Sequence, residues 1–124
     1  MHESVLVEIP ADTSHVALLR AAASALAARL DFTVDRITEL QICIDEVCSR
    51  LLAVTESPTT IRMEFQVKEG GIAIRAAADG RRRADRELLS DWSRVILEAI
   101  ATELSPEVSD GHTALSLLVT KAAR

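Results

Sequence analysis

The chain has 124 residues, of which 48% are hydrophobic and 27% are charged, so it has the length and composition of one globular domain and not of a disordered or collagen-like chain. Aromatic residues are only 2% and the net charge is −5, which argues against base stacking and against a basic nucleic-acid-binding face. No apolar run approaches the ~20 residues that span a bilayer, and the first ten residues lack the features of a secretory signal. We therefore expect a single domain over residues 1–124, in the cytoplasm, that binds neither nucleic acid nor membrane.

The spacing of apolar residues predicts the elements of the fold in chain order. Alternation predicts half-buried strands, and recurrence every three or four residues predicts helices. The candidate N-caps of the first helix are Asp12, Thr13 and Ser14, and Thr33 or Asp35 is expected to cap the second helix. The expected elements are a strand at 4–9, a helix from these first caps to 30, a helix at about 34–54, strands at 61–67 and 72–78, a helix at about 86–104, a short strand near 107–109, and a strand at 113–121.

The third helix and the loop before it carry two further expectations. Residues 79–85 read as a polar loop, and Ser105–Pro106 is expected to end the helix that follows. The residues predicted to form the broad apolar face of that helix are Leu88, Leu89, Trp92, Val95, Ile96, Ala99 and Ile100. A turn is expected at 109–111, before the last strand.

This order of elements predicts an α+β two-layer sandwich. A mixed, mostly antiparallel sheet would be covered on one face by three helices. The other face would be wet, and the residues expected there are Arg62, Glu64, Gln66, Arg75, Ser116 and Thr120. This wet face, the first helix and the arginine-rich loop at 81–83 are the candidate interaction surfaces.

The most informative segment is the second predicted helix, which places Asp45 and Glu46 in the middle of a largely apolar sequence. Carboxylates in such a position must face water, a partner or a site. One interpretation is an ordinary surface ion pair between Glu46 and Arg50, four residues apart on the helix. The other interpretation is a functional carboxylate.

Several short motifs follow the order of a known family. They are Pro10–Ala11 after the first strand, Leu18–Arg20, Phe32 in a turn, Asp45–Cys48 on the second helix, and Gly111 with Thr113 before the last strand. The chain thereby resembles the GHKL, or histidine kinase-like, ATPases, in the form of RsbW-type anti-sigma factors that are also serine-protein kinases. The resemblance covers residues 4–121, implies a Bergerat-type fold, and is strongest to the actinobacterial UsfX-like anti-sigma-F subgroup.

The resemblance aligns the family's catalytic glutamate with Glu46. In the family this carboxylate is the general base for a seryl hydroxyl of the antagonist protein. The family's magnesium-binding asparagine aligns with Arg50, which offers no oxygen to a hard cation but could contact phosphate. The change at this position implies that magnesium binding is weakened or lost.

The glycine-rich boxes of the family are also incomplete in this chain. The adenine-reading box aligns with Asp79 and Gly80, which no second glycine follows, and the next box aligns with 91–94, where no glycine occurs. Gly111 and Thr113 match the family's last nucleotide contact. The cluster at 81–83 lies where the family has its nucleotide lid, and it reads either as a lid or partner contact or as a solvated loop.

These observations lead to three hypotheses about function. The first is an anti-sigma factor that sequesters an alternative sigma factor and requires no cofactor, with ATP or ADP bound weakly if at all. The resemblance implies a homodimer and a STAS-domain anti-anti-sigma factor as competitor. The second is an active serine kinase that uses Glu46 and the candidate nucleotide contacts Arg50, Asp79, Gly80, Gly111 and Thr113. The third is a generic interaction domain with an accidental resemblance.

The cysteines and histidines suggest no further chemistry. Cys43 and Cys48 read as small buried hydrophobic residues, and a redox role would require one exposed thiol. The histidines at positions 2, 15 and 112 are scattered without other ligands at metal-binding spacing, so we expect no metal site.

Overall fold

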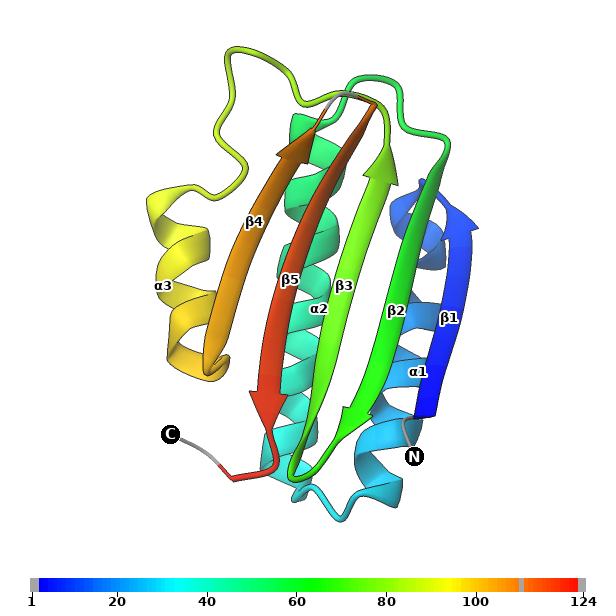
Figure 1. The fold of residues 1–124 in the computed structure, drawn as a ribbon, viewed down its shortest axis with the longest axis vertical. Coiled ribbons are helices and arrows are strands. Elements are labelled where there is room, and N and C mark those ends of the chain that lie inside the picture. Colours follow the sequence, from blue (N-terminus) through cyan, green and yellow to red (C-terminus); the bar gives the residue numbers. More distant parts are fainter. Residues whose placement is uncertain (1–2, 110, 123–124) are drawn as a thin grey trace.

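A computed structural model describes residues 3–109 and 111–122 (Figure 1). A single turn of 3-10 helix at Thr13–His15 precedes the first long helix. The remaining elements are β1 (Glu3–Pro10), α1 (Val16–Arg29), α2 (Val34–Val54), β2 (Thr60–Lys68), β3 (Gly71–Asp79), α3 (Asp91–Ile100), β4 (Glu103–Ser109) and β5 (His112–Thr120).

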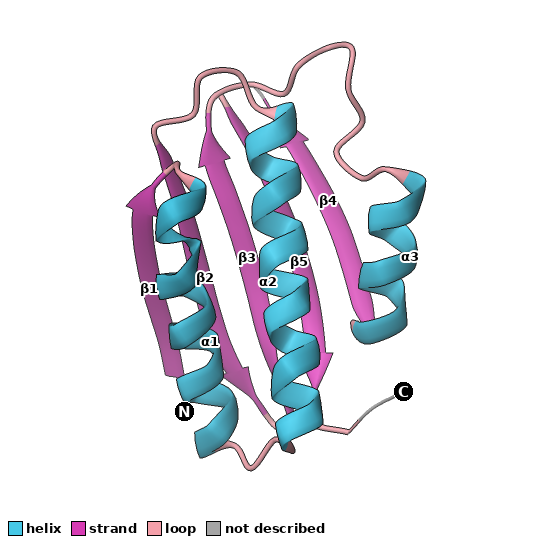
Figure 2. Ribbon diagram, turned by 180° about the vertical axis from the view of Figure 1, so that it is seen from behind, coloured by secondary structure: helices cyan, strands magenta, loops and turns pink. Residues whose placement is uncertain are grey.

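The five strands form one sheet in the order β1-β2-β3-β5-β4, and the helices cover one of its faces (Figure 2). Each of the four described pairings is antiparallel, so the sheet is antiparallel where a mixed sheet was predicted. The reason is the hairpin of α1 and α2, which returns the chain to the end of the sheet that it left, so that Thr60 pairs with Pro10. The predicted α+β sandwich with three helices on one face is confirmed.

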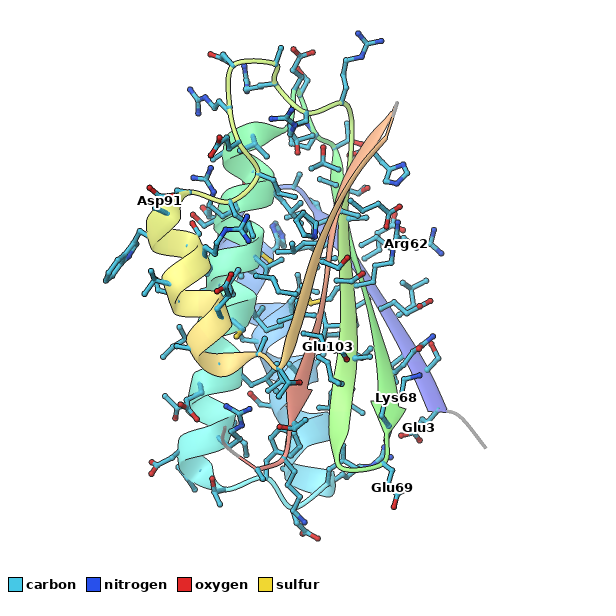
Figure 3. All side chains as sticks on the ribbon, turned by 60° about the vertical axis from the view of Figure 1, so that its left-hand side comes forward. Glu3, Arg62, Lys68, Glu69, Asp91 and Glu103 are labelled. Carbon is cyan, nitrogen blue, oxygen red and sulfur yellow. The ribbon has the colours of Figure 1, made fainter. Side chains whose placement is uncertain are left out.

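The core lies between the helices and the inward-facing strand positions. Fully buried side chains come from every layer, among them Leu19, Leu40, Leu51, Phe65 and Leu115. Burial of each such side chain contributes about 1.5–3 kcal/mol. The opposite face of the sheet is polar, and Figure 3 shows Arg62 and Lys68 on the side away from the helices.

The helix starts agree with two of the predicted caps. The Asp12 side chain accepts a hydrogen bond from the Ser14 backbone N–H at 2.9 Å, and Thr33 Oγ1 accepts one from the Arg36 N–H at 3.1 Å. Both bonds satisfy N–H groups that a helix start otherwise leaves without partners.

The third helix is shorter than predicted. It begins at Asp91 because the Ser90 hydroxyl accepts the Ser93 N–H at 3.1 Å, and it ends at Ile100. Residues 103–109, expected to be helix and turn with at most a short strand near 107–109, form the full edge strand β4. Pro106 is compatible with this strand because an edge strand has a neighbour on one side only, so not every backbone N–H has to donate a hydrogen bond within the sheet. The predicted turn at 109–111 contains Asp110, which lies outside the described residues.

The orientation of α3 also differs from the prediction. Its buried residues are Ser93, Leu97 and Ile100, whereas Trp92 and Val95 are 69% and 60% exposed. Leu88 and Leu89 are buried as predicted, but they belong to the segment before the helix. The helix therefore has two apolar sides, and the side that contains Trp92 faces outward.

One buried charge connects the ends of three elements. Arg36, near the start of α2, is only 2% exposed. Its Nε donates to the Thr120 carbonyl of β5 at 2.8 Å, and its Nη2 donates to the Ile100 carbonyl of α3 at 2.9 Å. Its remaining nitrogen lies 3.3 Å from the Glu39 carboxylate. This guanidinium satisfies the terminal carbonyl of α3, which has no partner within its own helix.

No helix among the described residues is long and apolar enough to cross a membrane.

Candidate functional site

Glu46 lies on α2 and is half-buried against α3. Its Oε2 accepts a hydrogen bond from the buried Ser93 hydroxyl at 3.1 Å. The Ser93 hydroxyl lies 2.7 Å from the Ser90 hydroxyl, which caps the same helix. The carboxylate is thus held in place by the first turn of α3. The neighbouring Asp45 pairs instead with Arg20 of α1 at 2.6 Å, on the outer surface of the helix layer.

Arg50 lies one turn beyond Glu46 on α2 and binds backbone oxygens. Its Nε donates to the Leu88 carbonyl at 2.9 Å, and its Nη2 donates to the Glu87 carbonyl at 2.8 Å. These contacts differ from the expected surface ion pair with Glu46. They fix the segment before α3 against the side of α2.

Asp79 ends β3, and its carboxylate closes the turn before β2. Oδ1 accepts the backbone N–H groups of Thr59 and Thr60 at 2.7 and 2.8 Å, and Oδ2 accepts the Thr59 hydroxyl. Burial acts to raise the pKa of Asp79, but the bonds from Thr59 and Thr60 outweigh it and lower the pKa below its ordinary value. The side chain also lines a cavity of about 310 Å³ that includes Arg62 and His112 of the sheet.

Gly80 and Gly111 are brought together, since the Gly80 N–H donates to the Gly111 carbonyl at 2.9 Å. Gly80 has a φ of +116°, and a Cβ there would lie 2.6 Å from the Glu56 carbonyl oxygen. Thr113 is fully buried and pairs with Ala78 in the sheet. Its hydroxyl has no hydrogen-bond partner among the described residues, and the same is true of the buried Thr55 hydroxyl.

The arginine-rich loop is paired with the end of α2. The Arg83 N–H donates to the Val54 carbonyl at 2.6 Å, and the Glu56 N–H donates to the Arg81 carbonyl at 2.9 Å. The side chains of Arg81 and Arg83 are exposed, while the backbone of the loop is held. The loop therefore combines solvated side chains with a fixed backbone.

The predicted site residues thus fall into two groups. Glu46 and Arg50 make their contacts within the helix layer, with α3 and the segment before it. Asp79 makes its contacts at the end of the sheet, with Thr59 and Thr60. The described hydrogen bonds do not join Glu46 to Asp79.

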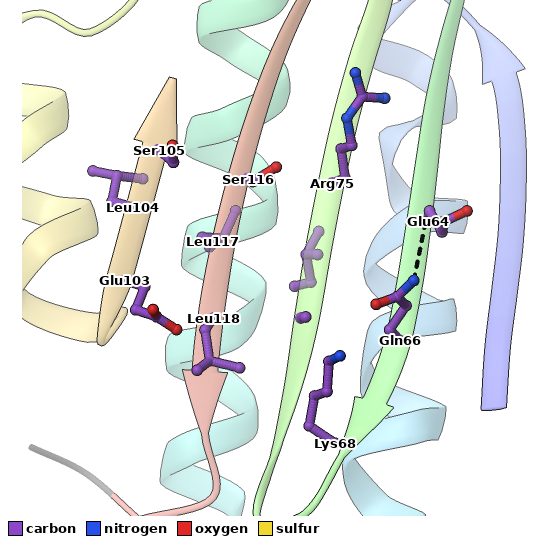
Figure 4. A pocket seen from close by; sticks show the side chains of 12 residues that line it. Glu64, Gln66, Lys68, Arg75, Glu103, Leu104, Ser105, Ser116, Leu117 and Leu118 are labelled. Carbon is purple, nitrogen blue, oxygen red and sulfur yellow. Dashed lines mark hydrogen bonds between the residues drawn. The ribbon is translucent and has the colours of Figure 1, made fainter. Parts of the chain in front are cut away.

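A larger cavity of about 610 Å³ lies on the open face of the sheet (Figure 4). Its labelled polar residues include Glu64, Lys68 and Glu103, and Gln66 Nε2 donates to Glu64 Oε1 at 3.5 Å. This cavity coincides with the wet face predicted from the alternating strands. It is separate from Glu46 and Arg50, which belong to α2 in the helix layer on the other side of the sheet.

Comparison with known proteins assigns the fold to a family. The family model of the histidine kinase-like ATPase domain matches residues 9–109. The chain belongs to this family. The serine-protein kinase RsbW of Bacillus cereus strain B4264 is 31% identical over 80 residues, which cover 63% of this chain and 50% of that protein. RsbW proteins of Bacillus thuringiensis strain Al Hakam and Bacillus anthracis strain A0248 are each 30% identical over 80 residues.

The match confirms the family suggested by the motifs and rules out an accidental resemblance. The aligned part spans about half the length of the curated relatives. The activity and partners of those whole proteins therefore reach this chain only as proposals.

Two of the residues that align with the family's nucleotide contacts are already engaged by this chain's own backbone or side chains. Arg50 offers no oxygen ligand, and two of its N–H groups are already bound to carbonyls. Both oxygens of Asp79 accept bonds from Thr59 or Thr60. Among the described residues, the buried hydroxyls of Thr55 and Thr113 have no hydrogen-bond partner and could receive a ligand or a water molecule.

The cysteine thiols and the side chains that could bind a metal do not extend this site among the described residues. Cys43 and Cys48 are both buried, and burial raises the pKa of each thiol to about 12. A redox role for either thiol is therefore wrong, since that hypothesis required an exposed one. Among the described residues, histidine, cysteine and carboxylate side chains do not gather into a group of three that could hold a metal.

Sequence reasoning missed three of the residues that organise this region. Ser93 entered the sequence analysis only as part of 91–94, where the family has glycine and this chain has none. In the structure its hydroxyl binds Glu46. Arg36 was not singled out, although an arginine inside the apolar stripe of a helix should prompt a search for buried carbonyls. Ser90 had a readable signal, because a serine before a helix start is a typical N-cap.

Proposed function

We propose that this domain is an anti-sigma factor that binds and sequesters an alternative sigma factor, and that its nucleotide site is degenerate. The observation that carries the proposal is the arginine at the family's magnesium position. Arg50 uses its guanidinium to hold the backbone of Glu87 and Leu88, a structural task instead of a catalytic one. Family membership supports the binding role, and these contacts support the loss of the chemistry.

Electrostatics favour a basic partner. The chain has a net charge of −5, and complementary charge speeds and orients association. A DNA-binding sigma factor offers basic surfaces of this kind. We further propose that the domain acts in the cytoplasm as a homodimer, that a STAS-domain anti-anti-sigma factor competes for it, and that it requires no cofactor.

The test is a pull-down from the native cell followed by reconstitution with the captured sigma factor. We expect a complex with submicromolar affinity whose dissociation constant is the same with and without MgATP. If the protein forms no complex at micromolar concentration with any sigma factor of that cell, the proposed binding role is rejected. An affinity that depends on MgATP would reject the degenerate site and leave the binding role intact.

The second candidate is an active serine kinase that phosphorylates the STAS-domain protein. It is favoured by the half-buried Glu46 carboxylate and by the unpartnered buried hydroxyl of Thr113. It requires magnesium-dependent ATP binding and phosphate transfer. Glu46→Gln should then abolish transfer while sigma-factor binding is retained. Calorimetry that finds no ATP affinity below the millimolar range would reject this candidate.

A further inference from the structure

The segment between β3 and α3, residues 80–90, contacts the C-terminal half of α2 at both of its ends. We call this segment the strap. Figure 2 shows it leaving β3, passing the C-terminal end of α2 and descending to α3. Near β3, two backbone hydrogen bonds join Arg81 and Arg83 to Glu56 and Val54. Near α3, the Arg50 guanidinium holds the strap through two carbonyls.

The strap supplies hydrogen-bond donors to the last carbonyls of α2, which have no partners within the helix. A helix leaves its last four carbonyls without partners and carries partial negative charge at that end. α2 has no basic residue in its last turn. The Ala53 carbonyl instead accepts Arg86 Nη1 at 3.0 Å, and the Val54 carbonyl accepts the Arg83 N–H at 2.6 Å. The Arg86 side chain therefore caps this helix end, and Arg83 does so through its backbone N–H.

The far end of the strap is tied into the core. Leu88 and Leu89 are buried, and the next residue, Ser90, caps α3. Among the described hydrogen bonds, Arg50 is the residue of α2 that reaches this end of the strap, through the carbonyls of Glu87 and Leu88. A mobile nucleotide lid would require these contacts to break.

We propose that the strap is a fixed clamp held by Arg50, and that it replaces the nucleotide-dependent lid of the family. Arg50 is then a positioning residue: its guanidinium orders the strap without ATP or magnesium. One consequence rests on the proposed function, namely that the surface presented to the sigma factor is set permanently and does not respond to nucleotide.

Hydrogen–deuterium exchange of the free protein tests the clamp. In the wild type we expect slow amide exchange in residues 80–90. Addition of MgATP at about 5 mM, a concentration chosen to occupy a weak site, should not change this exchange rate. Arg50→Ala should accelerate exchange in the strap by about tenfold or more, because two charge-assisted bonds are lost. Arg94→Ala, which removes an exposed pair with Glu98 on α3, is the matched control and should leave the strap unchanged.

A second variant covers the case in which Arg50→Ala unfolds the domain. Arg86→Ala removes the bond to the Ala53 carbonyl from the side of the strap and should accelerate exchange in the strap several-fold. Strap exchange equal to the Arg94→Ala control in both variants, or slowed by MgATP in the wild type, would overturn the clamp. Because the sigma factor is absent from this experiment, failure of the proposed binding function would leave its result unaffected.

Discussion

Replacement of Arg36 by alanine should be among the most damaging single changes outside the apolar core. The side chain is 2% exposed and donates two hydrogen bonds to backbone carbonyls, at Ile100 and Thr120. Alanine would leave both carbonyls buried without a partner. The pair with Glu39 adds little, because that side chain is 40% exposed to solvent.

The magnitude follows from the two lost bonds. A hydrogen bond from a charged donor contributes about 1.5–3 kcal/mol, so two of them contribute about 3–6 kcal/mol. Relief of the desolvation cost of the buried charge and entry of water reduce the net loss to about 3 kcal/mol. For a domain of this length, that loss corresponds to a fall in Tm of about 10 °C.

Urea denaturation followed by circular dichroism is the assay, with the midpoint compared at constant m-value. Arg36→Lys should lose most of the same stability, because one ammonium cannot bond both carbonyls in the directions of the guanidinium fork. Arg94→Ala should change stability by less than about 0.5 kcal/mol, as expected for an exposed helix pair. If Arg36→Ala were as stable as Arg94→Ala, the role assigned to the buried guanidinium would be refuted.

Three further predictions concern the turns, the sheet end and α3. Gly80→Ala should lower the Tm several degrees more than Gly111→Ala does. Both glycines have a positive φ, but of the two only Gly80 would place a Cβ against backbone, 2.6 Å from the Glu56 carbonyl oxygen. Equal losses of Tm in the two variants would contradict this prediction. Asp79→Asn should destabilise the protein at neutral pH, since the carboxylate has a pKa below its ordinary value of 3.8 and stabilises the folded state while ionised. The difference from wild type should vanish as the pH falls through the folded-state pKa, and a difference that persists to pH 2 in urea titrations would argue against it. Trp92, the single tryptophan, should emit like tryptophan in water and be quenched readily by acrylamide, because it is 69% exposed; a blue-shifted, protected emission would place it in the core as the sequence suggested.

The strands other than β4 and the first two helices were predictable because their signals are local. The alternation over 61–67 and 72–78 reports which side of each strand is buried, and β2 and β3 extend these ranges by one residue at each end. The cap residues Asp12 and Thr33 were readable for the same reason, since a cap binds backbone only two or three residues away.

The third helix was mispredicted because its sequence has apolar residues on two sides. Periodicity shows that such a helix is amphipathic or buried, but it does not show which side meets the core. Packing against α2 and β4 selected Leu97 and Ile100 and left Trp92 outside. The strand that follows contains Pro106, and only its place at the edge of the sheet makes it compatible with that residue.

The amino-acid sequence by itself determined the family, the order of the elements and the placement of Glu46 and Arg50 one turn apart on one helix. These properties depend on residue type and on spacing within a few positions of the chain. Tertiary structure alone decided what each side chain binds: Arg50 holds Leu88, Arg36 holds Thr120, and Asp79 holds Thr59. The partners lie 38, 84 and 20 residues apart, and a hydrogen bond forms only where folding brings donor and acceptor within about 3 Å.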